Sequence, residues 1–228
     1  MTSKSLLRAA ILSAYREVGP DLGREVTDEM AVPAYLQGIA LSRYVFWRKL
    51  HCVIRAAKLV PNSRVFDFGC GTGILLPQLA AAGRSVVATD LHPLMARNVI
   101  KQLRLSRVTL VPADQWPDSI PDGEIETVIA ANVLEHIDER RELLQVLGRK
   151  LTPTGRLVIS GPTENRLYRL GRRIVGFSGR YHVTNIHDIV ADARAVGLRQ
   201  VYRRRWPAPG PLSLYHIAAF ELPDAGRR

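Results

Sequence analysis

The residues of this chain that could do chemistry gather where an apolar segment meets a glycine-rich turn. The run from 65 to 73 reads Val-Phe-Asp-Phe-Gly-Cys-Gly-Thr-Gly, so Asp67 precedes glycines at alternate positions, Gly69, Gly71 and Gly73. Glycine can adopt positive φ, and without a Cβ it lets a ligand approach the backbone closely. The dinucleotide-binding turn of oxidoreductases has the spacing G-x-G-x-x-G instead. The run therefore predicts a nucleotide-sized binding turn of another kind; a turn without ligand is the alternative.

Three more apolar segments follow this turn, and each is followed by a polar residue near its end. The pairs are 85–89 before Asp90, 108–111 before Asp114, and 126–131 before Asn132. Apolar runs of this length between helix-like segments predict strands of a parallel sheet, whose carboxyl ends meet at one edge. Asp90 is placed to accept hydrogen bonds from both hydroxyls of a ribose, and it could also cap the helix predicted from Pro93 to Leu103.

These features, in this order, resemble a known enzyme family. The run from 65 to 73 is similar to motif I of the class I S-adenosylmethionine-dependent methyltransferases. The string Asn-Val-Leu-Glu-His-Ile at 132–137 resembles the element after strand four in the group that includes the ubiquinone and menaquinone methyltransferases. The resemblance implies S-adenosylmethionine as cofactor. This ligand has no phosphate, so the loop must supply close approach and an anionic partner for the ammonium group.

For single residues, the resemblance implies a cofactor site at the ends of these strands. Asp67 is expected beside the ammonium group, Asp90 on the ribose and Asp114 on the adenine amino group. Cys70 also fits as a small side chain packed inside the loop. The expected cofactor-binding residues are Asp67, Gly69, Cys70, Gly71, Gly73, Asp90, Leu91, Asp114, Gln115 and Asn132.

The predicted fold is an α/β, Rossmann-like sheet with helices on both faces. Strand and helix alternate up to a fifth strand at 156–160, which implies parallel strands with ligands at their carboxyl ends. Strands six and seven are predicted at 198–203 and 214–222. The segment between them contains three prolines and is too short for a crossover, so strand seven should run antiparallel. The resemblance implies seven strands in the order 3-2-1-4-5-7-6.

An N-terminal helical extension, residues 1–60, is expected before the methyltransferase domain at 61–222, and 223–228 should be a flexible tail. The helices of the N-terminal extension are predicted at 5–18 and 39–60, with a loop between them that includes Pro20 and Asp21. Apolar positions of the second helix recur every three, four or seven residues, with basic residues largely elsewhere. We expect this helix to pack on the sheet domain while the segment before it covers the cofactor. Lying on an anionic membrane surface is the alternative.

The segment 161–187 is the expected acceptor cap. It leaves strand five beside the cofactor and is longer than a usual connection. Tyr168, Phe177 and Tyr181 could form apolar walls, and the arginines of the segment could receive an anion. A surface segment without ligand contact is the alternative.

Transfer of a methyl group to a hydroxyl needs a group that accepts the hydroxyl proton. Histidine titrates in the useful range, and His136 and His182 are the two candidate catalytic bases, although each could be structural instead. Some relatives hold a divalent ion with a pattern like E-x-x-E-H and a distant histidine. Glu135, His136 and His182 fit that pattern, but Asn132 replaces its first acid. No catalytic metal is therefore predicted.

The net charge of +11 could suit nucleic acid, anionic lipid or an acidic substrate. Two stretches, 30–66 and 165–187, are locally cationic because they contain basic residues and no acids. The favoured function is methylation, at oxygen, of an anionic or membrane-associated small molecule. RNA methylation is one alternative, although no RNA-binding motif accompanies the charge. A non-catalytic, cofactor-binding partner subunit is another. With two cysteines and no long apolar segment, the expected location is the cytoplasm, with peripheral membrane contact as an option.

Overall fold

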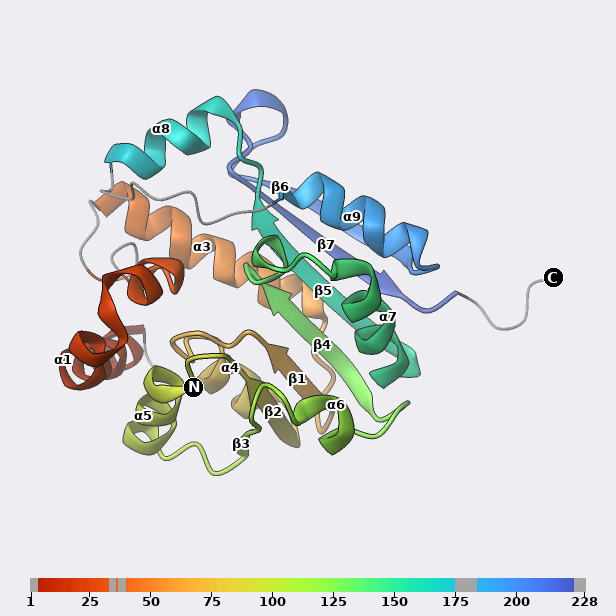
Figure 1. Cartoon of the computed structure of the whole chain (residues 1–228), viewed down its shortest axis with the longest axis horizontal. Coiled ribbons are helices and arrows are strands. Elements are labelled where there is room, and N and C mark those ends of the chain that lie inside the picture. Colours follow the sequence, from red (N-terminus) through yellow and green to blue (C-terminus); the bar gives the residue numbers. More distant parts are fainter. Residues whose placement is uncertain (1–3, 33–35, 37–39, 175–183, 224–228) are drawn as a thin grey trace.

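The protein is built around one seven-stranded sheet (Figure 1). The computed structural model describes residues 4–32, 36, 40–174 and 184–223. The strands, in chain order, are β1 (Arg64–Phe68), β2 (Ser85–Thr89), β3 (Val108–Leu110), β4 (Ile125–Ala131), β5 (Leu151–Pro162), β6 (Arg199–Trp206) and β7 (Tyr215–Glu221). Their order in the sheet is β3-β2-β1-β4-β5-β7-β6, which confirms the predicted topology.

The first five strands are parallel, and β7 is antiparallel to both of its neighbours. The connection from β6 to β7 holds only the short 3-10 helix η2 (Gly210–Leu212), and Leu214 N–H donates to Trp206 O across it. A crossover needs about a dozen residues, so this link forces the antiparallel return. The carboxyl ends of β1, β2, β4 and β5 therefore meet at one edge of the sheet.

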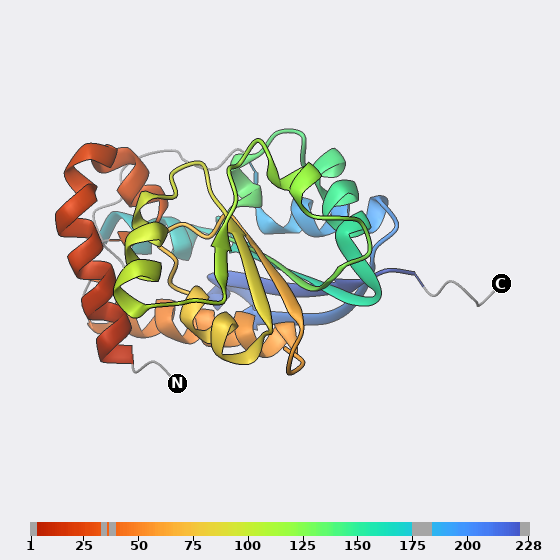
Figure 2. The same ribbon diagram turned by 90° about the horizontal axis from the view of Figure 1, so that it is seen from below.

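Helices cover both faces of the sheet (Figure 2). On one face lie α3 (Ala40–Ala57) and α4 (Leu76–Ala82), and on the other lie α7 (Arg140–Lys150) and α9 (Ile186–Ala195). The short α6 (Trp116–Ser119) joins the second layer through Trp116. Successive strand residues point to opposite faces. In β1, Val65 belongs to the core under α3 and α4, and Phe66 to the core under α7 and α9.

The N-terminal helix α1 (Lys4–Glu29) is longer than predicted, and the loop expected at Pro20 and Asp21 is helical. Pro20 lies inside the helix, and the chain kinks at Gly23, whose backbone is non-helical with φ 76° and ψ 166°. A glycine adopts such angles readily, so the chain turns there and a further helical stretch follows. Helix α1 packs beside α5 (Leu94–Leu103), where Gln102 Nε2 donates to Ser13 Oγ at 3.2 Å.

Helix α3 packs on the sheet as expected, with Leu50, Val53 and Ala57 buried. Two details correct the predicted pattern. Val60 lies beyond the end of the helix and is exposed. Lys49, one of the basic residues expected on the outer face, lies on the buried face instead.

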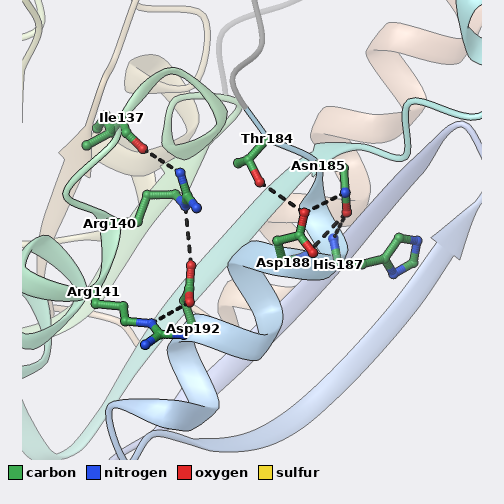
Figure 3. Close-up of polar contacts among 8 residues, drawn as sticks. All are labelled: Ile137, Arg140, Arg141, Thr184, Asn185, His187, Asp188 and Asp192. Atoms are coloured by element: carbon green, nitrogen blue, oxygen red, sulfur yellow. Dashed lines mark hydrogen bonds and ion pairs between the residues drawn. The ribbon is translucent and has the colours of Figure 1, made fainter.

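The segment after β5 forms α8 (Arg166–Ile174) and leads to α9. Phe177, Tyr181 and His182 lie outside the described residues. Asn185 caps α9, because its Oδ1 accepts from the N–H groups of His187 and Asp188 (Figure 3). Helix α9 is tied to α7 by Asp192, which pairs with both Arg140 and Arg141. Over the described part of the chain, none of the helices has the length and apolar character needed to cross a membrane.

Candidate active site

The glycine-rich loop after β1 is fastened to the end of β2. The N–H groups of Gly69 and Cys70 both donate to Thr89 O, at 2.9 and 3.0 Å. Gly69, Gly71 and Gly73 all have positive φ, between 53° and 76°. Residues with a side chain rarely adopt these angles. The alternating glycines are therefore required first of all by the path of the backbone.

The three glycines differ in what a side chain would meet. A Cβ at Gly69 would lie 2.5 Å from Val133 Cγ2, and one at Gly73 would lie 3.1 Å from Ala96 Cα. Both positions are filled by packing within the protein. At Gly71 the nearest atom to a Cβ would be Met30 Cγ, at 3.9 Å. Gly71 is thus the glycine of this loop that faces open space, where a ligand can approach the backbone.

Asp67 is a buried carboxylate at the end of β1, with 1% of its surface exposed. Among the described residues its Oδ2 has no hydrogen-bond partner. Burial raises the pKa of Asp67 to about 7, and the nearby charge of Asp90 acts in the same direction. A buried carboxylate of this kind is costly unless it is paired, so a cationic ligand group placed against it would be favoured.

Asp90, after β2, shapes the glycine loop. Its Oδ2 accepts from Gly71 N–H at 2.7 Å, and its Oδ1 accepts from His92 N–H at 2.9 Å. The N-cap residue of α5 is Pro93, and no side chain caps this helix end by a hydrogen bond. Asp90 is therefore not the cap of α5. Each carboxylate oxygen can still accept a second hydrogen bond, so a ligand hydroxyl could bind there.

One cavity of about 790 Å³ lies at this edge of the sheet. Its volume falls in the upper part of the range usual for ligand sites. Most of the residues predicted for cofactor binding and catalysis line it: Asp67, Gly69, Cys70, Gly71, Asp90, Leu91, Asn132 and His136. Three predicted cofactor residues do not line it. Gly73 packs against α5, and Asp114 and Gln115 have exposed side chains, with Ala113 and Trp116 forming the wall beside them.

The opposite end of the cavity is formed by helices and is mostly apolar. Its walls come from the first half of α3, α8 and the start of β7. Contributing residues include Leu41, Val45, Phe46, Leu167, Tyr168 and Tyr215. Three of the rings touch edge to face, with centroids 5.8 Å apart for Phe46 and Tyr215 and 5.6 Å apart for Tyr168 and Tyr215. The cavity therefore joins a polar loop at one end to an aromatic wall at the other.

Lys49 is a functional candidate that the sequence prediction missed. Its Nζ donates to Asn132 Oδ1 at 2.8 Å, and it lines the cavity between the polar and aromatic ends. Asn132 has φ 60°, which asparagine tolerates better than most residues, and its Nδ2 donates to Glu135 Oε1 at 3.2 Å. The sequence did hold a signal. Lys49 lies three residues after Phe46 and four before Val53, within the apolar stripe of α3.

Of the two predicted bases, His136 lies in the short 3-10 helix η1 (Leu134–His136) and lines the cavity, half-buried. His182 lies outside the described residues. Beside His136, Asn132 stands where the metal pattern has its first acid, and its side chain is already engaged. Asn132 Oδ1 already accepts from Lys49 Nζ and from Ser160 Oγ. Within the described ranges, no group of three or more His, Cys, Asp or Glu side chains could hold a metal ion.

Comparison with known protein families shows to which family a chain with this cavity belongs. Residues 42–203 match the family described as methyltransferase domain. The chain belongs to this family, as a class I S-adenosylmethionine-dependent methyltransferase domain. The match includes the glycine loop, the strand-end acids and most of the aromatic wall. The cofactor of the family fits the residues present. Asp67 offers an unpaired buried carboxylate for the ammonium group, and Gly71 leaves its Cβ space open.

Curated relatives match about half of this chain. The mitochondrial ubiquinone biosynthesis O-methyltransferase of Schizosaccharomyces pombe is 32% identical over 122 residues, which cover 52% of this chain and 44% of that protein. The ribosomal protein L11 methyltransferase of Bordetella parapertussis is 32% identical over 111 residues, covering 48% of this chain and 34% of that protein. The chain thus spans less than half the length of these relatives.

Solved structures of low sequence identity share the fold. The N-methyltransferase NodS of Bradyrhizobium japonicum, in complex with S-adenosyl-L-homocysteine, has a TM-score of 0.65 at 17% identity. The match covers 92% of this chain and 98% of NodS. The [4+2]-cyclase SpnF has a TM-score of 0.67 at 16% identity and covers 92% of this chain and 93% of its own. At such identities the likeness concerns the fold alone.

Proposed function

We propose that this protein transfers a methyl group from S-adenosylmethionine to an oxygen atom of a small apolar acceptor, one that is anionic or associated with membranes. The observation that carries this proposal is the continuous cavity. The glycine loop, Asp67 and Asp90 form its cofactor end, and Phe46, Tyr168 and Tyr215 form an acceptor end opposite. Methyl transfer is a direct displacement, so holding the acceptor atom in line with the methyl group supplies much of the catalysis.

The covering of the cavity favours a small acceptor over RNA. Asp28 and Met30 of the α1 region line the cavity, with Met30 beside Gly71, and Leu167 and Tyr168 of α8 line it as well. A macromolecule would need an open groove at the methyl group. A small molecule can be enclosed by these two helices while water is excluded. Residues 1–60 and 161–187 therefore serve, in this proposal, as the lid and the acceptor cap.

The rim of the cavity supports an apolar or membrane-associated acceptor. Leu41, Leu91 and Leu167 line the cavity and are nevertheless exposed, Leu91 to 81%. Arg166 and Arg169 of α8 are exposed beside this apolar rim. Apolar side chains flanked by arginines suit contact with anionic lipid or with an amphipathic acid. Methylation at oxygen is further supported by the likeness to ubiquinone biosynthesis O-methyltransferases.

Incubation with methyl-labelled S-adenosylmethionine tests the proposal. The purified protein is offered a membrane-lipid extract, a water-soluble metabolite extract, total RNA and total protein, in separate reactions. We expect label in the lipid or metabolite fraction, in a small product that resists treatment with protease and ribonuclease. Label in RNA alone, or in protein alone, contradicts a small acceptor. Binding of S-adenosylhomocysteine without labelling of any fraction supports the non-catalytic subunit instead.

The matched control is a pair of glycine variants. Gly71→Val fills the cavity at the loop, whereas Gly123→Val imposes a side chain at a similar positive φ of 74° with no atom within 4 Å. Gly123 lies in an exposed turn away from the cavity lining. Labelling that survives in Gly123→Val and disappears in Gly71→Val arises from this cavity rather than from a contaminating enzyme.

A further inference from the structure

Lys49 stands out in the cavity wall because it is a charged side chain held among aromatic rings. Only 2% of its surface is exposed. Its Nζ lies 4.6 Å from the ring centroid of Tyr215 and 5.0 Å from that of Phe46. Cation–π contacts of this kind partly compensate an ammonium group for the loss of water. They also place the nitrogen against the surfaces that would enclose a flat acceptor.

A hydrogen-bonded chain fixes the position of the nitrogen. Lys49 Nζ donates to Asn132 Oδ1, which also accepts from Ser160 Oγ, and Asn132 Nδ2 donates to Glu135 Oε1. Asn132 itself is anchored, since its N–H donates to Ser160 O at 2.8 Å. An ammonium group has three donors. Among the described residues, one of them is used in the hydrogen bond to Asn132, and Lys49 lines the cavity.

The electrostatic setting makes this amine able to exchange a proton near neutral pH. Burial lowers the pKa of Lys49 to about 8, and the charge of Glu135 opposes that shift. Glu135 comes from η1, and the ionisable ring packed on Nζ is Tyr215 of β7. Glu135 is itself buried, with 1% exposed. The negative charge of Glu135 acts on Lys49 and can balance an ammonium ion that forms during a reaction.

The location joins the two ends of the cavity. Asn132, the partner of Lys49, follows β4, which pairs directly with β1. The glycine loop and Asp67 lie at the end of β1, so Lys49 is held next to the cofactor end by the neighbouring strand. From the other side, Phe46 and Tyr215 extend away into the apolar acceptor end.

From this geometry we infer that Lys49 Nζ is the group that binds the reacting oxygen of the acceptor and takes its proton, and that the acceptor is a flat apolar molecule with a phenol-type hydroxyl. The inference rests on the proposed methyl transfer and names its substrate class. In the step, the hydroxyl hydrogen-bonds to the neutral amine. The oxygen–methyl bond forms as the sulfur–methyl bond breaks, and the proton passes to Nζ. The products are a methyl ether, a neutral thioether and an ammonium ion balanced by Glu135.

His136 lies in the same cavity and is the competing base. It belongs to η1, the element that also carries Glu135, whereas Lys49 approaches from α3 on the aromatic side. The apolar ring of a phenol would lie against the wall formed by Phe46 and Tyr215, with its hydroxyl toward Lys49 rather than toward His136. Variants of the two residues separate these roles.

The test uses 4-nitrophenol as probe, because its ionised form absorbs visible light and its neutral form does not. The protein is first saturated with S-adenosylhomocysteine and held at a pH below the pKa of the free probe. With wild-type protein we expect bound nitrophenolate, seen as the visible band. Lys49→Met should weaken probe binding by roughly tenfold or more and abolish the band, as expected for loss of a charged hydrogen bond. Lys101→Met, an exposed lysine of α5, should behave as wild type.

Three outcomes overturn the inference: no probe binding by wild type, an unchanged band in Lys49→Met, or loss of the band in His136→Gln with retention in Lys49→Met. A second measurement needs no acceptor. The chain has five lysines, so NMR of protein labelled at the lysine side chains can follow each titration. One signal, absent from Lys49→Met, should titrate near 8. A wild-type spectrum without such a signal contradicts the inference.

These experiments distinguish failure of the proposed methyl transfer from failure of the proposed role of Lys49. If the proposed function is wrong, wild-type protein labels no fraction, or labels RNA or protein alone, while the probe and NMR results still report on Lys49. If only the role of Lys49 is wrong, wild-type protein labels its fraction and the probe complex is the same in Lys49→Met.

Discussion

The two ends of the cavity carry opposite chemistry. At the loop end, Asp67 is a buried acid whose pKa is raised to about 7, and at the helical end Lys49 is a buried base whose pKa is lowered to about 8. Burial is the main cause of both shifts, which are in opposite directions because burial favours the neutral form of each group. Each end thus holds a group that a ligand of opposite charge would stabilise.

The ends also differ in how they are built. The loop end depends on backbone: positive φ at three glycines, N–H groups bonded to Thr89 O, and a carboxylate that orients Gly71. The helical end depends on side chains from α3, α8 and β7 that meet only in the folded protein. A backbone site suits one constant ligand, whereas a side-chain wall can be changed by substitution. In the proposed function, cofactor recognition and acceptor recognition are therefore separable.

The largest effect is expected from a substitution in the glycine loop, at the loop end of the cavity. Gly71→Val should abolish binding of S-adenosylhomocysteine measured by calorimetry, because the side chain occupies the space that faces the cavity. Gly123→Val, with comparable backbone strain, should bind as wild type. Equal binding by the Gly71 variant contradicts the assignment of this loop to the cofactor.

At the helical end, Lys49→Met should raise the free energy of unfolding near neutral pH, by roughly 3 kcal/mol at most. The folded pKa of Lys49 is about 8 and its ordinary value is 10.5. Below pH 8 the lysine is protonated in both states and the full cost of burying its charge opposes folding. Between pH 8 and 10.5 the folded protein releases the proton first, so wild-type stability rises with pH.

Denaturant unfolding of both proteins at several pH values checks this prediction. The advantage of Lys49→Met over wild type should shrink as the pH rises through that window. An advantage that stays constant, or one that grows with pH, shows that the buried lysine does not titrate as described. Lys101→Met provides the baseline for removing an exposed lysine.

Asp90→Ala should weaken binding of S-adenosylhomocysteine by about 1.5 to 3 kcal/mol, the range for hydrogen bonds to a charged group. The variant loses both the contact with Gly71 N–H and the predicted contacts with the ribose. Calorimetry measures the change, and Asp118→Ala, an exposed acid in α6, is the control for charge alone. If the affinity of Asp90→Ala is unchanged, Asp90 does not contact the ligand and serves only to hold the glycine loop.

The smallest effect concerns a region outside the cavity. Asn185→Ala removes the cap of α9 (Figure 3) and should lower the free energy of unfolding by about 1 kcal/mol. Binding of S-adenosylhomocysteine should remain as in wild type, because Asn185 does not line the cavity. A change in affinity instead of stability would show that α9 is coupled to the cofactor end.

The loop end was predictable from sequence because its signals are local. The glycines, Asp67 and Asp90 lie within 25 consecutive residues at strand ends, and the parallel sheet brings such ends together. Gly73 was assigned to the ligand although it serves packing against α5, since spacing does not reveal which neighbour fills a glycine's empty side. Pro20 suggested a helix end, but α1 continues through Pro20 and kinks at Gly23 instead.

The helical end could not be predicted in the same way. Lys49 meets Asn132 across 83 residues and Tyr215 across a still longer separation, and such contacts exist only after α3 packs on the sheet. A rule that places basic residues on the solvent face of an amphipathic helix fails where the buried face borders a ligand cavity. His182, the other predicted base, lies outside the described residues and stays a prediction.

A crystal structure of the protein with S-adenosylhomocysteine tests the central claim most directly. We predict the ammonium group of the ligand on Asp67 Oδ2, the ribose on Asp90, and the sulfur directed toward the space between Lys49 and the aromatic wall. A ligand bound elsewhere, or a sulfur directed away from Lys49, would contradict the division of this cavity into a cofactor end and an acceptor end.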